Sequence, residues 1–243
     1  MTQATATSPP TVNLSRLHWL LGVQSVVIVL LSINRLSTLA LGYVHPNEFL
    51  RWVDLNNMLI LPVVSLLALY LLKKQMEAAG GKAGRRWGLA LNLAFILGAY
   101  LLGASYGDHE VTNYLHARFC PEGDSSALCR IVMFNDDEFS HWVFFTGFVL
   151  VNGALMLLQV VYPHPGALRG VDWALVIFNG FFIGAGVFAN LAFEEIGLDL
   201  YIVALLAILA ALLIWRRGPQ PLLVYYATAY WLGLVGTLIY TNL

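Results

Sequence analysis

Residues 141–162 read HWVFFTGFVLVNGALMLLQVVY, a run of 22 residues that contains no Lys, Arg, Asp or Glu. A helix needs about 20 consecutive apolar residues to cross the roughly 30 Å hydrocarbon core of a bilayer. Because that core holds no water, a spanning segment must satisfy its own backbone hydrogen bonds, and a helix does so. This run therefore predicts a transmembrane helix.

Six further segments have the same character, and the whole chain is correspondingly apolar. Hydrophobic residues make up 59% of the 243 residues and charged residues 11%, whereas globular proteins average about 45–50% and about 25%. So few charges exclude a disordered chain, a coiled coil and a nucleic-acid-binding surface. The alternating strands of a membrane barrel are also missing from the sequence. We predict an all-α polytopic membrane protein, one domain over residues 1–243, with seven transmembrane helices at 17–41, 57–72, 87–107, 141–162, 171–193, 200–215 and 222–243.

The basic residues orient this bundle. Positively charged residues favour cytoplasmic loops, and the connection between the second and third spans is rich in them. With that connection inside, alternation places the N-terminus in the cytoplasm and the C-terminus outside, and nine of the thirteen basic residues fall on the cytoplasmic side. The first ten residues lack the basic region of a secretory signal, so the first span is expected to be retained. We predict a multi-pass protein of the cell (inner) membrane.

The acidic residues separate in the opposite sense. Glu77 and Asp172 lie on the predicted cytoplasmic side, whereas the other twelve acids lie at or beyond the outer ends of the spans, with four of the six histidines. Many of them occur in the predicted outer loop 108–140, on the periplasmic or extracellular face. Because carboxylate and imidazole groups serve as metal ligands and as acid–base groups, we expect the functional site there.

Cys120 and Cys129 are the two cysteines of the chain, and both fall in this outer loop. A disulfide persists in an exported loop. We therefore predict a Cys120–Cys129 bridge, with two unpaired thiols as the alternative.

Residues 108–116, DHEVTNYLH, directly follow the third span. If the helix continues past Gly107, then His109, Asn113 and His116 are spaced i, i+4 and i+7 and share one face. Two imidazoles on one face could hold a divalent metal or pass protons. The alternative is an ordinary polar helix end in contact with water.

Residues 135–141, NDDEFSH, lead into the fourth span. Glu138 and His141 form the E-x-x-H unit that carboxylate-bridged di-iron bundles use, and Asp137 is four residues before the same histidine. The alternative is a helix cap, in which Asn135 or Asp136 starts the helix and acids are favoured by its dipole. Capping accounts for one or two acids but not for three acids followed by a histidine.

A further acidic pair, Glu194-Glu195, ends the fifth span. Glu194 shares a helix face with Asn190 and is the better candidate to point inward, whereas Glu195 fits a solvated turn. Arg35, near the outer end of the first span, would either neutralise an acid such as Asp54 or extend to the interface.

These groups favour a membrane-embedded, metal-dependent enzyme with a His/carboxylate site at the outer face. Zinc or non-haem iron suits such nitrogen and oxygen ligands. Zinc would activate a bound water for hydrolysis and two irons would support oxidation, in each case of a lipid-like or amphipathic substrate that arrives between the helices. The expected metal ligands are His109, His116, Glu138 and His141, and the expected catalytic carboxylates are Asp108, Asp137 and Glu194.

Two other roles stay open from the sequence. A cation or proton transporter would use the outer acids as a vestibule, although polar residues near the middle of the spans are few and uncharged. A non-catalytic subunit of a membrane complex, or a homo-oligomer, would use the acidic face to bind its partner.

Overall fold

The computed structural model describes residues 12–79, 85–121, 126–193 and 197–242. Seven helical segments in these residues are long and apolar enough to cross a membrane, so the predicted all-α fold with seven transmembrane helices is confirmed. Five of the segments are single long helices: α1 (Leu14–Leu36), α4 (Arg85–Phe119), α7 (Gly170–Phe193), α8 (Leu198–Arg217) and α9 (Pro221–Thr241).

The other two segments are continuous helices that contain a π-helical turn. The second span consists of α2 (Trp52–Leu55), the π-helix η1 (Asn56–Ile60) and α3 (Leu61–Ala79). The fourth consists of α5 (Ala127–Met133), the π-helix η3 (Phe134–Phe139) and α6 (Ser140–Val161). Both π-helices pack against α4. Single π turns inside α-helices occur frequently at functional sites.

The segment 108–140, predicted as an outer loop, is largely helical. α4 continues to Phe119 and α5 begins at Ala127. Residues 108–119 contain no Gly or Pro, and nothing else in their sequence stops a helix. The loss of hydrophobicity after Gly107 marks the expected edge of the membrane and not the end of the helix.

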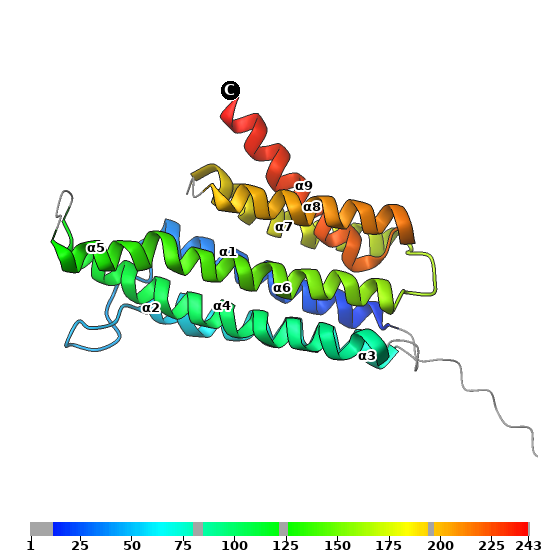
Figure 1. The fold of residues 1–243 in the computed structure, drawn as a ribbon, viewed down its shortest axis with the longest axis horizontal. Coiled ribbons are helices and arrows are strands. Elements are labelled where there is room, and N and C mark those ends of the chain that lie inside the picture. Colours follow the sequence, from blue (N-terminus) through cyan, green and yellow to red (C-terminus); the bar gives the residue numbers. More distant parts are fainter. Residues whose placement is uncertain (1–11, 80–84, 122–125, 194–196, 243) are drawn as a thin grey trace, which may run out of the picture.

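The helices form two groups (Figure 1). α3, α4 and α6 lie side by side in one group, and α7, α8 and α9 form the other. α1 contacts α3 in the first group and α7 in the second, while α6 contacts α8. The buried core between the groups is apolar, with Leu17, Leu155, Leu206 and Leu222 among its fully buried side chains.

α4 and α6 pack very closely at two glycines. A Cβ atom added to Gly98 would lie 2.8 Å from Leu150 Cβ, and one added to Gly147 would lie 2.8 Å from the Gly98 carbonyl oxygen. Small residues of this kind allow two membrane helices to approach at backbone distance. This contact fixes the position of α4 relative to α6. It therefore also fixes the side chains at the end of α4 relative to those just before α6.

Cys120 and Cys129 form a disulfide, as predicted. It joins the end of α4 to the first turns of α5, so the two helices make a closed helical hairpin. With 35 residues, α4 is about 52 Å long at about 1.5 Å per residue, which exceeds the roughly 30 Å hydrocarbon core. The hairpin end of α4 and α5 therefore extends beyond the length that a membrane span requires.

The two ends of the bundle differ in charge. The end where α1 and α4 finish and α6 begins carries most of the described acids and is called the site end below. At the opposite end lie Lys73 and Lys74 near the end of α3, Arg169 before α7, and Arg216 and Arg217 at the end of α8. The separation by charge agrees with the sequence, and the assignment of the site end to the outer face stays a prediction.

Candidate metal-binding site

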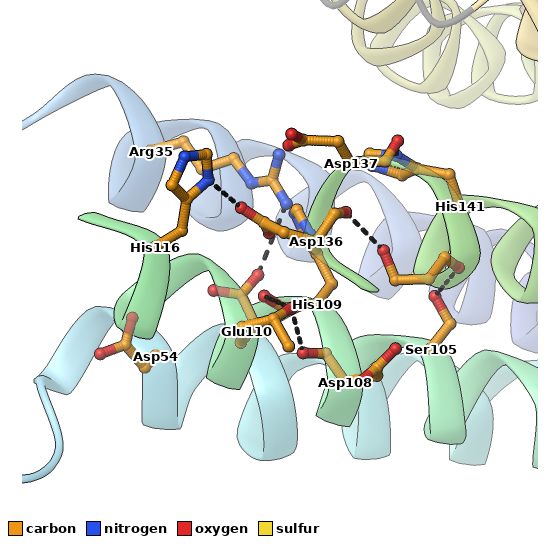
Figure 2. A network of polar contacts seen from close by, with 12 residues as sticks. Arg35, Asp54, Ser105, Asp108, His109, Glu110, His116, Asp136, Asp137 and His141 are labelled. Carbon is orange, nitrogen blue, oxygen red and sulfur yellow. Dashed lines mark hydrogen bonds and ion pairs between the residues drawn. The ribbon is translucent and has the colours of Figure 1, made fainter. Parts of the chain in front are cut away.

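The candidate site lies where η3 packs against the last turns of α4. His109 and His116 are seven residues apart on α4 and share a face, and both reach the carboxylate of Asp136 on η3 (Figure 2). His116 Nδ1 lies 2.9 Å from Asp136 Oδ2 in hydrogen-bond geometry. His109 Nδ1 lies 3.1 Å from the other oxygen, Asp136 Oδ1. One carboxylate thus links two histidines from a neighbouring helix.

Asp136 is almost completely buried, with its side chain 2% exposed. A buried carboxylate must be compensated by hydrogen bonds, by a cation or by a metal ion. Among the described residues, no Lys or Arg nitrogen lies within ion-pair distance of Asp136. The two histidines are therefore its compensating groups in the part of the chain that the structure describes.

Two buried atoms of this cluster lack a hydrogen bond. Asp136 Oδ1 and His109 Nδ1 are 3.1 Å apart, but their angles do not fit a hydrogen bond, and neither atom has another hydrogen-bond partner. Buried polar atoms without a partner are uncommon in folded proteins. An oxygen and an imidazole nitrogen in this state are suited to share a bound cation.

Asp137 and His141 complete the cluster. One ligand atom each from His116, Asp136 and Asp137 lies within 4.8 Å of the others, a spacing that one metal ion can bridge. The rings of His109 and His141 lie 5.0 Å apart between centroids. His141 Nδ1 lies 2.8 Å from the Asp137 carbonyl oxygen. The other ring nitrogen, Nε2, is therefore directed away from this carbonyl group.

Two other buried acids at the site end, Asp54 and Glu110, have arginine partners. Arg51 binds Asp54 with two hydrogen bonds of 2.8 and 2.7 Å, and this contact raises the pKa of Arg51. Arg35 Nη2 lies 3.4 Å from Glu110 Oε1. From the sequence, Asp54 was one possible partner of Arg35, whereas in the structure Arg35 forms an ion pair with Glu110. These pairs balance the charge of their acids and leave Asp136 as the acid held by histidines.

The backbone of η3 is held in place by two buried serines. Ser140 Oγ donates a 2.7 Å hydrogen bond to the Asp136 carbonyl oxygen, and Ser105 Oγ on α4 donates a 2.8 Å bond to the Ser140 carbonyl oxygen. A π turn contains one more residue than an α turn and changes which side chains face the neighbouring helix. The serines therefore fix the turn that directs Asp136 toward α4.

Ser105 also lies in the stretch GASYG, residues 103–107, which has the G-x-S-x-G spacing of serine hydrolases. In those enzymes the serine stands on a sharp turn between a strand and a helix. Here Ser105 is inside α4 and its hydroxyl is bonded to the Ser140 carbonyl. Ser105 therefore joins α4 to the start of α6 and does not stand on the turn that a serine nucleophile requires.

Several predicted site residues come together in the structure. His109, His116 and His141 lie around Asp136 and Asp137, and the helix continues past Gly107 as the spacing of the two α4 histidines required. Asn113, between these histidines on α4, is exposed. The combination of His116, Asp136 and Asp137 within 4.8 Å is the metal-compatible group among the described residues.

Three other predicted residues lie elsewhere. Glu138 is exposed on η3 and is not in the group of three. Asp108 is half-buried on α4, with Oδ2 buried and without a hydrogen-bond partner, and it is not in the group either. Glu194 lies outside the described residues, as does its neighbour Glu195.

Asp136 was not among the residues predicted for the site. From the sequence it was considered only as a possible helix cap, in the alternative interpretation of residues 135–141. Within η3 it is helical on both sides and faces α4. The phase of the buried face could have identified it. Buried positions recur every three or four residues from α5 through η3 to the start of α6, at Cys129, Val132, Asp136 and Ser140.

Comparison with protein-family models, with curated proteins and with solved structures finds no match for this chain. The function is therefore argued from the site itself.

Proposed function

We propose that the protein is a membrane-embedded, metal-dependent enzyme whose metal is held by His116, Asp136 and Asp137. The observation that carries this proposal is the buried Asp136 carboxylate, which has imidazole nitrogens at 2.9 and 3.1 Å and no Lys or Arg partner among the described residues. A divalent cation would supply the positive charge that arginine supplies to the neighbouring acids. Asp136 Oδ1, which lies 3.1 Å from His109 Nδ1 without a hydrogen bond of good geometry, is the ligand oxygen that such a cation would compensate.

The ligand types favour zinc or ferrous iron. Imidazole and carboxylate are the ordinary ligands of both metals, and catalytic sites keep a position open beside three protein ligands. When bound, such a metal polarises a substrate carbonyl or phosphoryl oxygen and makes bound water more acidic. His109 and His141, whose rings flank the three ligands, are placed to accept and return a proton. We favour hydrolysis on this ground.

The surroundings support an amphipathic substrate. Phe134, Phe139 and Trp142 project from η3 and the start of α6 as exposed apolar side chains, between 43% and 47% exposed. Phe134 contacts both Phe139 and Trp142, and these three residues are close in sequence to Asp137 and His141. A substrate that moves in the bilayer could reach the cluster along these apolar side chains with its polar head toward the histidines.

A proton- or cation-conducting role has less support. Polar contacts do occur inside the described bundle: Ser25 Oγ donates to Asn179 Oδ1 at 2.7 Å, and Asn34 Nδ2 donates to Asn57 Oδ1 at 3.0 Å. Along α1 these two contacts are nine residues apart, which is about 13.5 Å. A proton path would need a chain of hydrogen bonds across that distance.

The metal content of the purified protein tests the proposal. The protein is loaded with Zn²⁺ or Fe²⁺, desalted, and analysed for metal beside two variants, Asp136→Asn and the control Asp172→Asn. Asp172 is an equally buried aspartate that also contacts a histidine, but it lies at the opposite end. We expect about one metal ion per chain in the wild type and in Asp172→Asn, and about tenfold less in Asp136→Asn, since a ligand is lost.

Two results would overturn the proposal. One is a wild-type protein that binds no metal, which would leave a transport or assembly role. The other is equal metal loss in both variants. An intact Cys120–Cys129 disulfide and a single peak in size-exclusion chromatography show that each variant has folded. Metal-dependent cleavage of ester, amide or phosphoester lipids, present in the wild type and absent in Asp136→Asn, would then identify the reaction.

A further inference from the structure

A second feature of the site end is a cavity of about 360 Å³ on the far side of α4 from the histidines. Successive residues turn by about 100° around a helix, so Val111 and Arg118 lie roughly 140–180° from His109 and His116. The cavity therefore lies mainly on another face of α4 than the proposed metal site, although Glu110, the neighbour of His109, also contributes to its wall. Most of its wall is apolar, with contributions from Phe49, Leu50, Met58, Val111, Leu115 and Phe119.

One wall of the cavity belongs to a short hairpin formed by residues 42–51. Val44 N donates to the Leu50 carbonyl oxygen at 2.8 Å, and Tyr43 and Arg51 form an antiparallel bridge. Glu48 at its tip has φ 59°, a left-handed conformation that is uncommon for residues other than glycine. Tyr114 and Arg118 of α4 both donate hydrogen bonds to the Glu48 carbonyl oxygen. These bonds hold the hairpin against α4 and keep Phe49 and Leu50 at the cavity.

The acids in the cavity wall do not give it a net charge. Asp54 is bound by Arg51, and Glu110 lies beside Arg35. Both carboxylates are buried, with side chains 4% and 6% exposed. The interior therefore favours an uncharged apolar chain over a cation.

The rim of the cavity is different, because Arg118 lies there and its side chain is 32% exposed. Its Nη2 is 3.6 Å from Glu48 Oε2, which is a long and partly solvated ion pair. The planar guanidinium group binds phosphate oxygens well. Phe49 and Phe119, 74% and 59% exposed, flank the cavity and connect it to the apolar outer surface. An apolar interior with an arginine at the edge complements an amphipathic anion.

We propose that this cavity binds one acyl chain of a phospholipid that is raised partly out of the adjacent leaflet, since Val111, Leu115 and Arg118 lie beyond Gly107 on α4, with the lipid phosphate on the Arg118 guanidinium group. The volume of about 360 Å³ is within the range of small-ligand pockets. Phospholipid is the amphiphile that surrounds a membrane-spanning bundle, and the exposed aromatic side chains give it a continuous apolar path inward. The site is independent of the proposed metal centre and of its reaction.

Photo-crosslinking tests this proposal. The full chain is reconstituted in phosphatidylethanolamine and phosphatidylglycerol vesicles that contain a phospholipid with a diazirine on one acyl chain, and the crosslinked residues are mapped by mass spectrometry. We expect crosslinks to concentrate on Val111, Leu115 and the 49–50 segment. Val111→Trp should lower the crosslinking yield there by about tenfold, since a filled pocket excludes its ligand. Arg118→Gln should lower it by about threefold, because it removes the charge at the rim and also the hydrogen bond from Arg118 to the Glu48 carbonyl oxygen.

The control is Leu205→Trp, which adds the same ring to an exposed position on α8. It should leave the yield at the cavity unchanged. A yield that Val111→Trp does not lower, or crosslinks spread evenly over exposed residues of every span, would overturn the proposal. Metal content, measured on the same samples, should be unchanged in all three variants, so failure of the lipid site and failure of the metal site are separate results.

Discussion

Asp136 and Asp172 occupy similar positions at opposite ends of the bundle, yet they are compensated in different ways. Each side chain is 2% exposed, and each has a histidine nitrogen within 3.1 Å. Asp172 also binds Arg169, through the guanidinium Nε at 3.0 Å and the backbone N–H at 3.2 Å. Among the described residues Asp136 has no arginine, and it has a second histidine instead.

The contrast separates a structural ion pair from a candidate metal site. At Asp172 the arginine is permanently charged and balances the carboxylate without a further ion, so the contact ties α1 to the start of α7 through His18. At Asp136 the described groups that contact the carboxylate are two histidines, which, unlike arginine, carry no permanent charge. Burial of an aspartate beside a histidine is therefore not sufficient evidence of a metal site, and the missing arginine decides the assignment.

The largest expected effect comes from giving Asp136 the partner that Asp172 already has. His116 is 30% exposed, which leaves room for a longer side chain. His116→Arg should replace the bound metal with an internal cation and lower the metal affinity by more than about 100-fold, because a ligand is lost and a positive charge is added. Isothermal titration with Zn²⁺ measures the affinity. His18→Arg at the opposite end is the matched control and should leave the Zn²⁺ affinity unchanged. Equal affinities in the two variants would contradict the assignment of the metal site to Asp136 and not to Asp172.

An intermediate effect is expected within η3 itself. Asp137 and the adjacent Glu138 are both exposed, but only Asp137 belongs to the group of three. Asp137→Asn should weaken Zn²⁺ binding by about tenfold or more, and Glu138→Gln should change it little. The same titration compares them. If Glu138→Gln weakened Zn²⁺ binding more than Asp137→Asn did, the proposed ligand set would be wrong. The metal ligand would then be Glu138, as the E-x-x-H spacing predicted.

The smallest effect should come from the serine that holds the π turn. Ser140→Ala removes the hydrogen bond to the Asp136 carbonyl oxygen, and one neutral hydrogen bond contributes about 1 kcal/mol, or about fivefold in affinity. Thr146→Ala, which removes the equivalent bond to the Trp142 carbonyl oxygen on the exposed side of α6, is the control. If both variants lowered the Zn²⁺ affinity equally, the hydrogen bond at the π turn would not contribute specifically to metal binding.

The fold could be predicted from the sequence because the spanning segments are marked by hydrophobicity alone. Segments such as 141–162 and 200–215 contain no charge, and the physics of the bilayer leaves a helix as the available form. The helical continuation to Phe119 was not apparent, since polarity marks the membrane edge and not the helix end. The disulfide was predicted because both cysteines fall in one segment that the sequence assigns to the outer face, and the structure contains the bond.

The site was predicted in part. Histidines 109, 116 and 141 were recognised from spacing, because residues on one helix share a face regardless of the rest of the fold. Asp136 was not, since which of three consecutive acids faces α4 depends on the phase that the π turn imposes. The Arg35–Glu110 contact depends on how α1 packs beside α4, and His18 beside Asp172 joins residues 154 positions apart. Such contacts belong to tertiary packing and leave no local pattern.

The most direct measurement of the central claim is an anomalous-scattering map from crystals of the protein grown with zinc. The account predicts a peak at the site end within bonding distance of a His116 nitrogen and of oxygens from Asp136 and Asp137, at about 2.0–2.2 Å as zinc requires. It predicts no peak at Asp172. A zinc peak beside Asp172, or none between α4 and η3 while Asp136 stays bonded to its histidines alone, would contradict the account.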